Sequence, residues 1–234
     1  MYPTFTSENR KRAISPADVS NIRKLYGIVH GKANGVPGST EKERKCPKSL
    51  DAIMQTANQQ TFVFHQGSSW RFKNQKVVQG PLPINRVFPN GPSFVNTSVT
   101  TGNLTILIEE RTIYGYILDT ESGTFIKADN FPKMLHDRVL FFPQASFPLS
   151  NGSVILLSDD VFATYDFRQN VPTMLNDKRV FYPNLPDELR GGVPQNVESD
   201  RVYWMFSEDE VYVYDNVVQQ VTSTTPLSHY FTCE

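Results

Sequence analysis

Apolar stretches followed by aromatic-rich stretches recur four times along the chain. Each copy is a short apolar segment, a tight polar turn, and a second segment in which aromatic residues alternate with other residues. This pattern is typical of two β-strands joined as a hairpin. The predicted hairpins span residues 62–72, 106–116, 154–166 and 203–215.

The four hairpins follow one another at a nearly constant spacing. Trp70, Tyr114, Phe162 and Tyr212 take corresponding places in the second strands and lie 44, 48 and 50 residues apart. A period of roughly 40 to 50 residues with short strands indicates propeller blades or an array. An ordinary all-β chain with aromatic hairpins is the alternative, but it does not explain the regular spacing. We therefore predict an all-β fold, a four-bladed β-propeller, in residues 46–233.

The two cysteines of the chain, Cys46 and Cys233, stand at the two ends of the repeat region. A propeller closes by bringing its first and last blades together, so we predict a disulfide between them. Disulfides persist in oxidising compartments. Three Asn-x-Ser/Thr sequons for glycosylation agree with that location; they begin at Asn96, Asn103 and Asn151. We expect an extracellular, secreted glycoprotein, and because residues 1–12 have no apolar signal core, we expect further sequence before Met1.

Composition and charge argue against some classes of function. The chain has 16 Phe, 10 Tyr and 16 Pro, which favour strands and turns over long helices. A formal net charge of -1 argues against nucleic acid as a main partner. The sequence contains no apolar run of about 18 residues, so we predict no transmembrane segment.

Residues 1–27 form a separate unit with one predicted helix. Ser15 is a suitable N-cap, Pro16 suits the first helical position, and Asp18 lies near the positive end of the helix dipole. Apolar side chains then recur on one face as far as the helix end at Gly27.

Two segments of this unit carry a family resemblance. Met1-Tyr2-Pro3-Thr4-Phe5 and Leu25-Tyr26-Gly27 resemble the end of a matrix metalloproteinase catalytic domain. The resemblance implies that Met1 is the Met-turn beneath a catalytic zinc, and that Pro3 and Phe5 are remnants of the S1′ pocket wall. The chain departs from the family at Phe5, where Tyr is usual, and at Ala17, where an acidic residue is common. Zinc would belong to a presumed full-length parent.

The zinc-binding residues of that family are absent from this sequence. A metzincin needs two His at i and i+4 on one helix, a Glu between them and a third His further on. The four histidines are His30, His65, His136 and His229, and no two lie within five residues of each other. We therefore predict no catalytic residues and no peptide hydrolysis by this chain as given.

The rest of the chain resembles the regions that follow the catalytic domain in the same family. Residues 28–45 have the Gly, Pro and charged composition of a flexible hinge linker. Cys46-Pro47 and Leu50-Asp51-Ala52-Ile53 then resemble the opening of a hemopexin-like domain, a four-bladed propeller. Aromatic-Pro pairs that close blades in that family recur here at Phe88-Pro89, Phe142-Pro143 and Tyr182-Pro183.

The hemopexin-like resemblance also implies a candidate ion site. In that family the opening Asp-Ala of each blade contributes to a central channel that holds ions, often calcium. Asp51 matches, and we align Asn96, Asn151 and Asn196 with it in the later blades. Calcium prefers about six to eight oxygen ligands. Structural turn residues are the alternative for the three Asn, and glycosylation competes at Asn96 and Asn151.

Other polar and aromatic groups are interpreted as structural. Asp159-Asp160, Glu208-Asp209-Glu210 and His65 fall in predicted hairpin turns, where we expect solvated side chains rather than acid–base catalysis. The aromatic side chains of the hairpins are expected to pack the blades; these are Trp70, Trp204, Tyr212 and Tyr214.

Two functions from different classes follow. The first is a non-catalytic binding or exosite module of a secreted matrix metalloproteinase, with extracellular matrix proteins, protease inhibitors or a second copy (a homodimer) as partners. The alternative is that the chain is a truncated part of a full zinc metalloendopeptidase that degrades extracellular matrix. A haem or plasma-ligand carrier is a third, weaker interpretation, because the chain has one propeller and no paired His ligands.

Overall fold

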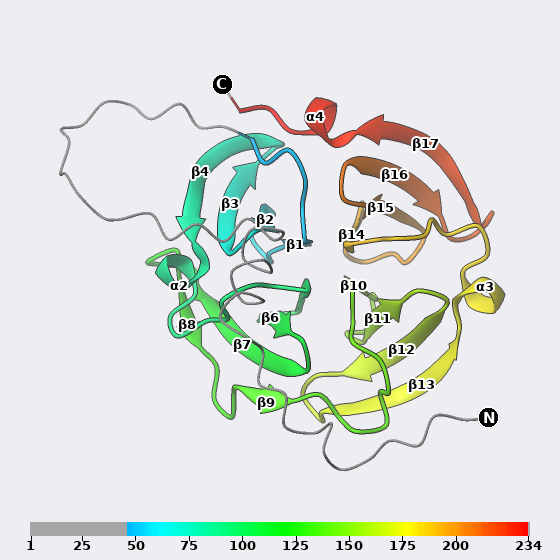
Figure 1. Ribbon diagram of the computed structural model, residues 1–234, viewed down its shortest axis with the longest axis horizontal. Coiled ribbons are helices and arrows are strands. Elements are labelled where there is room, and N and C mark those ends of the chain that lie inside the picture. Colours follow the sequence, from blue (N-terminus) through cyan, green and yellow to red (C-terminus); the bar gives the residue numbers. More distant parts are fainter. Residues whose placement is uncertain (1–45, 234) are drawn as a thin grey trace, which may run out of the picture. The chain divides into compact units, whose positions relative to one another are not determined.

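The computed structural model describes residues 46–233, which form four antiparallel sheets around a common centre (Figure 1). This confirms the predicted all-β, four-bladed propeller. The predictions for residues 1–27 and 28–45, which include the helix and the roles of Met1, Pro3 and Phe5, lie outside the described residues.

Each blade is built from strands that follow one another in sequence order. Blade 1 contains β1 (Ala52–Gln55), β2 (Gln60–His65), β3 (Ser68–Lys73) and β4 (Lys76–Pro83), followed by helix α2 (Ile84–Val87). Blade 2 contains β5 (Thr97–Thr101), β6 (Leu104–Glu109), β7 (Thr112–Asp119), β8 (Thr124–Lys127) and β9 (Lys133–Met134). Blade 3 contains β10 (Ala145–Pro148), β11 (Val154–Ser158), β12 (Val161–Asp166) and β13 (Val171–Asp177), followed by α3 (Lys178–Phe181). Blade 4 contains β14 (Gly191–Pro194), β15 (Val202–Phe206), β16 (Glu210–Asp215) and β17 (Gln220–Pro226), followed by α4 (Leu227–Tyr230).

The four predicted hairpins are the second and third strands of the blades. Their apolar runs are explained by burial on both faces, since each blade is covered by a neighbour on either side. All five residues of β11, Val154–Ser158, are buried. The outer strands have one face toward solvent and are correspondingly polar; β17, Gln220–Pro226, contains no fully buried residue.

The structure corrects the alignment of blade 3 by one residue. Trp70, Tyr114 and Tyr212 are each the third residue of their strands, but the third residue of β12 is Ala163. Phe162, which the sequence placed in this set, packs instead between blades 3 and 4. Because side chains alternate along a strand, a shift of one residue turns the side chain to the other face of the blade.

The hydrophobic core is divided into four clusters, each between two neighbouring blades. Strand β6 shows how one strand serves two of them. Leu107 joins the cluster shared with blade 1, whereas Ile106 and Ile108 join the cluster shared with blade 3. This alternation is the two-residue repeat of a β-strand, and it makes the ring of blades one continuous packing unit.

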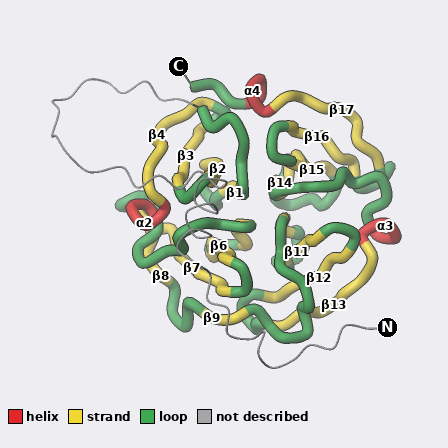
Figure 2. Tube along the Cα trace, viewed as in Figure 1, coloured by secondary structure: helices red, strands yellow, loops and turns green. Residues whose placement is uncertain are grey.

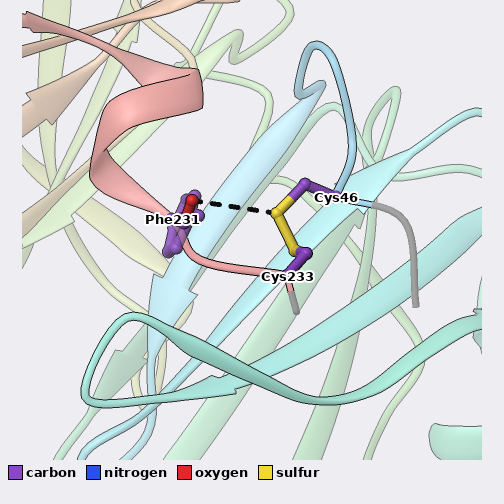
Figure 3. Close-up of a disulfide and its surroundings, with 3 residues drawn as sticks. All are labelled: Cys46, Phe231 and Cys233. Atoms are coloured by element: carbon purple, nitrogen blue, oxygen red, sulfur yellow. Dashed lines mark hydrogen bonds between the residues drawn. A yellow bond between two sulfur atoms is a disulfide. The ribbon is translucent and has the colours of Figure 1, made fainter. Parts of the chain in front are cut away.

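The ring closes between blades 4 and 1. The predicted disulfide Cys46–Cys233 is present, with the two Cα atoms 5.3 Å apart (Figure 3). The Phe231 carbonyl oxygen lies 3.9 Å from Cys46 Sγ, which has no proton to donate within a disulfide. Beside it, Val77 N donates to Thr232 O at 2.9 Å and Thr232 N donates to Gln75 O at 2.8 Å. The last segment of the chain is therefore held to the outer part of blade 1.

Blade 2 departs from the pattern of the other three. Its outer edge is divided, because β8 and β9 pair with different parts of β7. The segment between them places the Phe131 ring against Gly115, where a Cβ atom would lie 2.5 Å from the ring. The predicted Phe-Pro closure also differs after this blade: Phe142 is 56% exposed, and the neighbouring Phe141 packs on the core instead.

Candidate functional site at the two ends of the propeller axis

The first strands β1, β5, β10 and β14 pack against one another around the axis of the propeller, where Figure 1 labels β1, β10 and β14. Figure 2 shows the loops that converge on the centre between the four groups of strands. Small residues allow this approach. A Cβ at Gly191 of β14 would lie 2.9 Å from the Ile53 carbonyl oxygen and 3.5 Å from the Ser146 carbonyl oxygen. The backbones of blades 1, 3 and 4 thus come together at this point.

Hydroxyl groups are buried near the axis between blades 2 and 3. Thr97 Oγ1 and Ser146 Oγ are hydrogen-bonded at 2.7 Å, and Ser146 Oγ lies 3.1 Å from the Ser98 carbonyl oxygen that accepts from it. All three residues are fully buried. Ser98 Oγ has no hydrogen-bond partner among the described residues. Buried polar groups of this kind are costly unless they are paired.

One end of the axis is formed by the residues directly before the first strands. These are Asp51, Asn96, Gln144 and Arg190, and the backbone N of each donates to a carbonyl of the second strand in its own blade. The structure therefore supports the correspondence of Asp51 with Asn96. It does not support the correspondence of Asn151 and Asn196, which lie in loops after the first strands of blades 3 and 4, at the other end. In blades 3 and 4 the positions equivalent to Asp51 and Asn96 are occupied by Gln144 and Arg190, so an Asn does not mark this position in every blade.

Asp51 and Asn96 both cap the hairpin turn of their blade. Asp51 Oδ2 accepts from Gln66 N at 2.7 Å, and Asn96 Oδ1 accepts from Glu110 N at 2.5 Å. Gln66 and Glu110 are each the first residue after the second strand and have positive φ angles. These side-chain oxygens stabilise tight turns, which agrees with the structural alternative for Asn96.

His65 connects Asp51 to a serine at this end. Its Nδ1 lies 3.4 Å from Asp51 Oδ1, and its Nε2 lies 3.4 Å from Ser49 Oγ. The Nδ1 contact is close enough for an ion pair but is not aligned as a hydrogen bond. Both distances exceed the roughly 2.6–3.2 Å over which a general base takes a proton. We therefore assign this cluster to the support of the turn.

An acidic hollow of about 610 Å³ opens beside it, between the hairpin turn of blade 4 and the segments that precede β1 and β14. Its lining includes Lys48 and the acids Asp187, Glu188, Glu208, Asp209 and Glu210. The hydrogen bond and the charge of Lys178, whose Nζ is 2.6 Å from Asp187 Oδ1, lower the pKa of that carboxyl group. Across residues 46–233, no group of three or more His, Cys, Asp or Glu side chains is arranged to hold a metal ion.

The opposite end of the axis holds a cavity of about 490 Å³, which we call the strand-end cavity. It is lined by the ends of all four first strands and the loops that follow them, including Met54, Thr100, Pro148–Gly152, Val193 and Val197. Asp200 is the one charged residue in this lining. No local sequence pattern indicates the cavity, because its walls come from four segments that lie far apart in the chain. The repeat period could indicate the cavity only if the segments that follow the four first strands were compared with one another.

The Asp200 carboxylate already accepts three hydrogen bonds. Its Oδ1 accepts from Ser150 N at 2.7 Å and from Tyr203 OH at 2.8 Å, and its Oδ2 accepts from Ser150 Oγ at 2.8 Å. Burial, and then the hydrogen bond to Asp200, raise the pKa of Tyr203. The phenol therefore remains a proton donor at neutral pH, and the one carboxylate of the lining has both oxygens engaged in hydrogen bonds.

The three sequons occupy different environments. Asn151 is exposed at the rim of the strand-end cavity, and its Oδ1 accepts from Ser153 N at 2.9 Å. Asn103 is exposed in the turn between β5 and β6, on the same side of the propeller. Asn96 is half-buried at the opposite end, and Ser98 of its sequon is fully buried. Asn196 lies in the loop after β14, where its Oδ1 accepts from Glu198 N at 3.0 Å.

Comparison with known proteins identifies the fold. No protein-family model and no curated protein matches the chain. Among solved structures, a hemopexin fold protein, CP4 from cow pea, is similar with a TM-score of 0.66 and 8% identity, covering 80% of this chain and 96% of that chain. LS24, a seed albumin from Lathyrus sativus, has a TM-score of 0.63 and 14% identity, with the same coverage.

A third similar structure is a plant albumin from Cicer arietinum that shows hemagglutination. Its TM-score is 0.63 at 13% identity, covering 78% of this chain and 95% of that chain. At such identities the likeness concerns the fold and does not extend to metalloproteinase identity or to a shared ligand. No helix in residues 46–233 is long and apolar enough to cross a membrane. The described part of the chain therefore has the four-bladed propeller architecture of hemopexin-fold proteins.

Proposed function

We propose that the propeller is a binding module of a secreted protein and that the strand-end cavity is its recognition site. The observation that carries this proposal is the convergence of all four blades on one cavity of about 490 Å³. Concave sites with an apolar lining and a few fixed polar groups are the usual ligand sites of proteins. Here Met54, Val99 and Val193 supply apolar surface, and Gln55 and Thr100 supply polar groups.

The chemistry of the cavity favours an uncharged ligand group. An anionic group that entered it would lose hydration and meet the negative charge of Asp200, and a cationic group would find that carboxylate already engaged in three hydrogen bonds. An apolar or hydroxyl-bearing group on a protein partner fits these surroundings. The candidate partners are extracellular matrix proteins, protease inhibitors and a second copy of the chain.

Within this function, we propose a matrix metalloproteinase exosite as the finer assignment. It is supported by the likeness of residues 1–5 and 25–27 to a catalytic-domain end and by the disulfide-closed propeller that follows. The alternative is a full zinc endopeptidase whose zinc site is encoded before Met1. Transcript sequence upstream decides: an in-frame H-E-x-x-H-x-x-G-x-x-H supports both the family and the enzyme, and a stop codon without that motif contradicts them.

The binding proposal is tested with an exposed rim residue. Val197 lines the cavity and is 66% exposed, whereas Val217 is 70% exposed and lies outside the lining. We expect Val197→Arg to weaken binding to immobilised matrix proteins, a metalloproteinase inhibitor or the chain itself by about tenfold, or about 1.4 kcal/mol. Val217→Arg is the matched control. Equal binding by both variants, measured by surface plasmon resonance, would reject the cavity as the recognition site.

Calcium at the axis is a second proposal with its own observation. The carbonyl oxygens of Ile53 and Ser146 both lie close to Gly191 at the axis, and carbonyl oxygens are suitable calcium ligands. The side chains of Asp51 and Asn96 are already used in turns, so the carbonyl groups would be the ligands and a weak site is expected. A rise in thermal midpoint with millimolar calcium, but not with the same concentration of magnesium, supports the site; the same midpoint in calcium and in EDTA rejects it.

A further inference from the structure

Asn151 is held at the mouth of the strand-end cavity by a loop that is fixed on both sides. On one side, Ser150 donates two hydrogen bonds to Asp200. On the other, Thr101 Oγ1 donates to the Gly152 carbonyl oxygen at 2.7 Å. The Asn151 side chain is itself oriented by the bond from Ser153 N to Oδ1. Its position relative to the cavity is therefore well defined.

This arrangement leaves Nδ2 as the part of the side chain available for modification. The oxygen of the amide accepts from the backbone, so the nitrogen points away from that bond, and Asn151 and Gly152 are both exposed. The surroundings are open as well: a Cβ at Gly152 would find its nearest neighbour, Thr101 Oγ1, 4.0 Å away. Asn96, by contrast, is half-buried and caps a turn.

We propose that Asn151 carries an N-linked glycan that covers the mouth of the strand-end cavity and controls access to it. Such a glycan is bulky and hydrophilic, and its attachment point is part of the cavity rim. The inference rests on the proposed function, because it requires passage through the secretory pathway and a partner that uses the cavity. The glycan would regulate binding, because only the molecules that lack it would bind a partner at the cavity.

The modification itself is an ordinary transfer. A bond forms between Asn151 Nδ2 and the anomeric carbon of a sugar, Nδ2 loses one proton, and the lipid diphosphate that carried the oligosaccharide leaves. The oligosaccharide donor is supplied by the secretory pathway, and no oxidant or reductant is needed. The described residues have only to present the sequon on an accessible turn, which the 150–153 loop does.

Occupancy is tested first, with the full chain expressed behind a secretion signal in a glycosylating cell. Ser153→Ala removes the sequon but keeps the backbone N–H that Asn151 Oδ1 accepts from, and Ser153→Thr keeps both. We expect peptide mass spectrometry to find a glycan on Asn151 in the wild type and in Ser153→Thr, and none in Ser153→Ala. An unmodified Asn151 in the secreted wild type would overturn the inference.

Access is tested with a single introduced thiol, because both native cysteines are in the disulfide. We expect Val197→Cys to react several-fold more slowly with a polymer-linked maleimide when Asn151 is glycosylated than when Ser153→Ala is present. A small maleimide should react equally in both, and Val217→Cys should show no difference. Asn103→Gln removes a glycan from the same side of the propeller but outside the cavity lining, and should leave the rate at Val197→Cys unchanged.

Equal rates at Val197→Cys with and without the Asn151 glycan would overturn the control of access, even if the glycan is present. This outcome is separate from a failure of the proposed function. If the cavity is not a recognition site, Val197→Arg binds its partner normally in the unglycosylated protein, whatever the maleimide rates show.

Discussion

Two interfaces of the propeller hold neighbouring blades together with different contacts. One lies between blades 4 and 1, and the other lies between blades 2 and 3. The first joins the two ends of the described chain, and it combines a disulfide, backbone bonds from Thr232 and a cluster of apolar side chains. The second joins blades that are consecutive in sequence. It has its own apolar cluster, but it also buries the hydroxyl groups of Thr97 and Ser146.

The difference follows from chain connectivity. At the blade 4–1 interface no connecting segment keeps the blades together, so the contacts must overcome the entropy of closing a long loop. Between blades 2 and 3 the chain itself limits their separation. There, polar groups are tolerated, and the connecting segment is held by Arg111, whose guanidinium donates to the carbonyls of Leu135, His136, Val139 and Phe141.

The largest effect is expected from opening the disulfide. A loop with a sequence separation of 187 residues contributes at most about 5 kcal/mol in the chain-entropy model. Cys46→Ser with Cys233→Ser should therefore lower the thermal midpoint by up to about 10 to 20 °C. The measurement is differential scanning calorimetry, with reduction of the wild type as a second route. An unchanged midpoint would mean that the backbone and apolar contacts of blades 4 and 1 suffice.

The next effect is expected at Arg111. Arg111→Met leaves several carbonyl groups of the connecting segment without their donor, and hydrogen bonds to a charged group are worth about 1.5 to 3 kcal/mol. We expect a loss of stability of about that size in urea unfolding, with Arg111→Lys intermediate. Equal stability of wild type and Arg111→Met would show that the connection needs no such support.

A smaller effect is expected from the buried hydroxyl groups. Ser146→Ala leaves Thr97 Oγ1 without its partner and removes the hydroxyl bond to the Ser98 carbonyl, which should cost about 1 to 3 kcal/mol. Adding Thr97→Val removes the unpaired hydroxyl group and should recover part of the loss. A double-mutant cycle in urea measures the coupling. Strict additivity would contradict a direct contribution of the Thr97–Ser146 bond.

The smallest effect is expected on stability when the pH is lowered. Burial raises the pKa of Glu109, but bonds from Ser93, Tyr114 and Phe94 outweigh it and lower the pKa overall; Lys178 lowers the pKa of Asp187. Carboxyl groups with a lowered pKa bind fewer protons when folded, so their contribution is complete above the unfolded pKa near 4 and is lost as pH falls through the folded value. Glu109→Gln should reduce this acid sensitivity by about 0.2 to 1 kcal/mol. Identical stability–pH curves for the two proteins below neutral pH would contradict the assignment.

The sequence by itself determined the parts of this protein that depend on neighbours along the chain. The alternation of apolar and aromatic residues identified all four hairpins, and their spacing with Cys46 and Cys233 at the ends identified a closed ring of four blades. These features are local or periodic, so they appear in a single sequence.

Tertiary structure alone decided which residues meet at the axis. It replaced Phe162 by Ala163 in the blade alignment, separated Asn151 and Asn196 from Asp51, and formed the strand-end cavity from four distant loops. The physical reason is that the face that a side chain takes changes with every residue, so a shift of one residue moves it to the other face of the blade. Asn residues also stand both before a first strand, as Asn96 does, and after one, as Asn151 and Asn196 do, so residue type alone does not give the end of the axis. Only closure of the ring brings those loops together, and it places Asn151 at the mouth of a cavity, at the opposite end of the axis from Asp51.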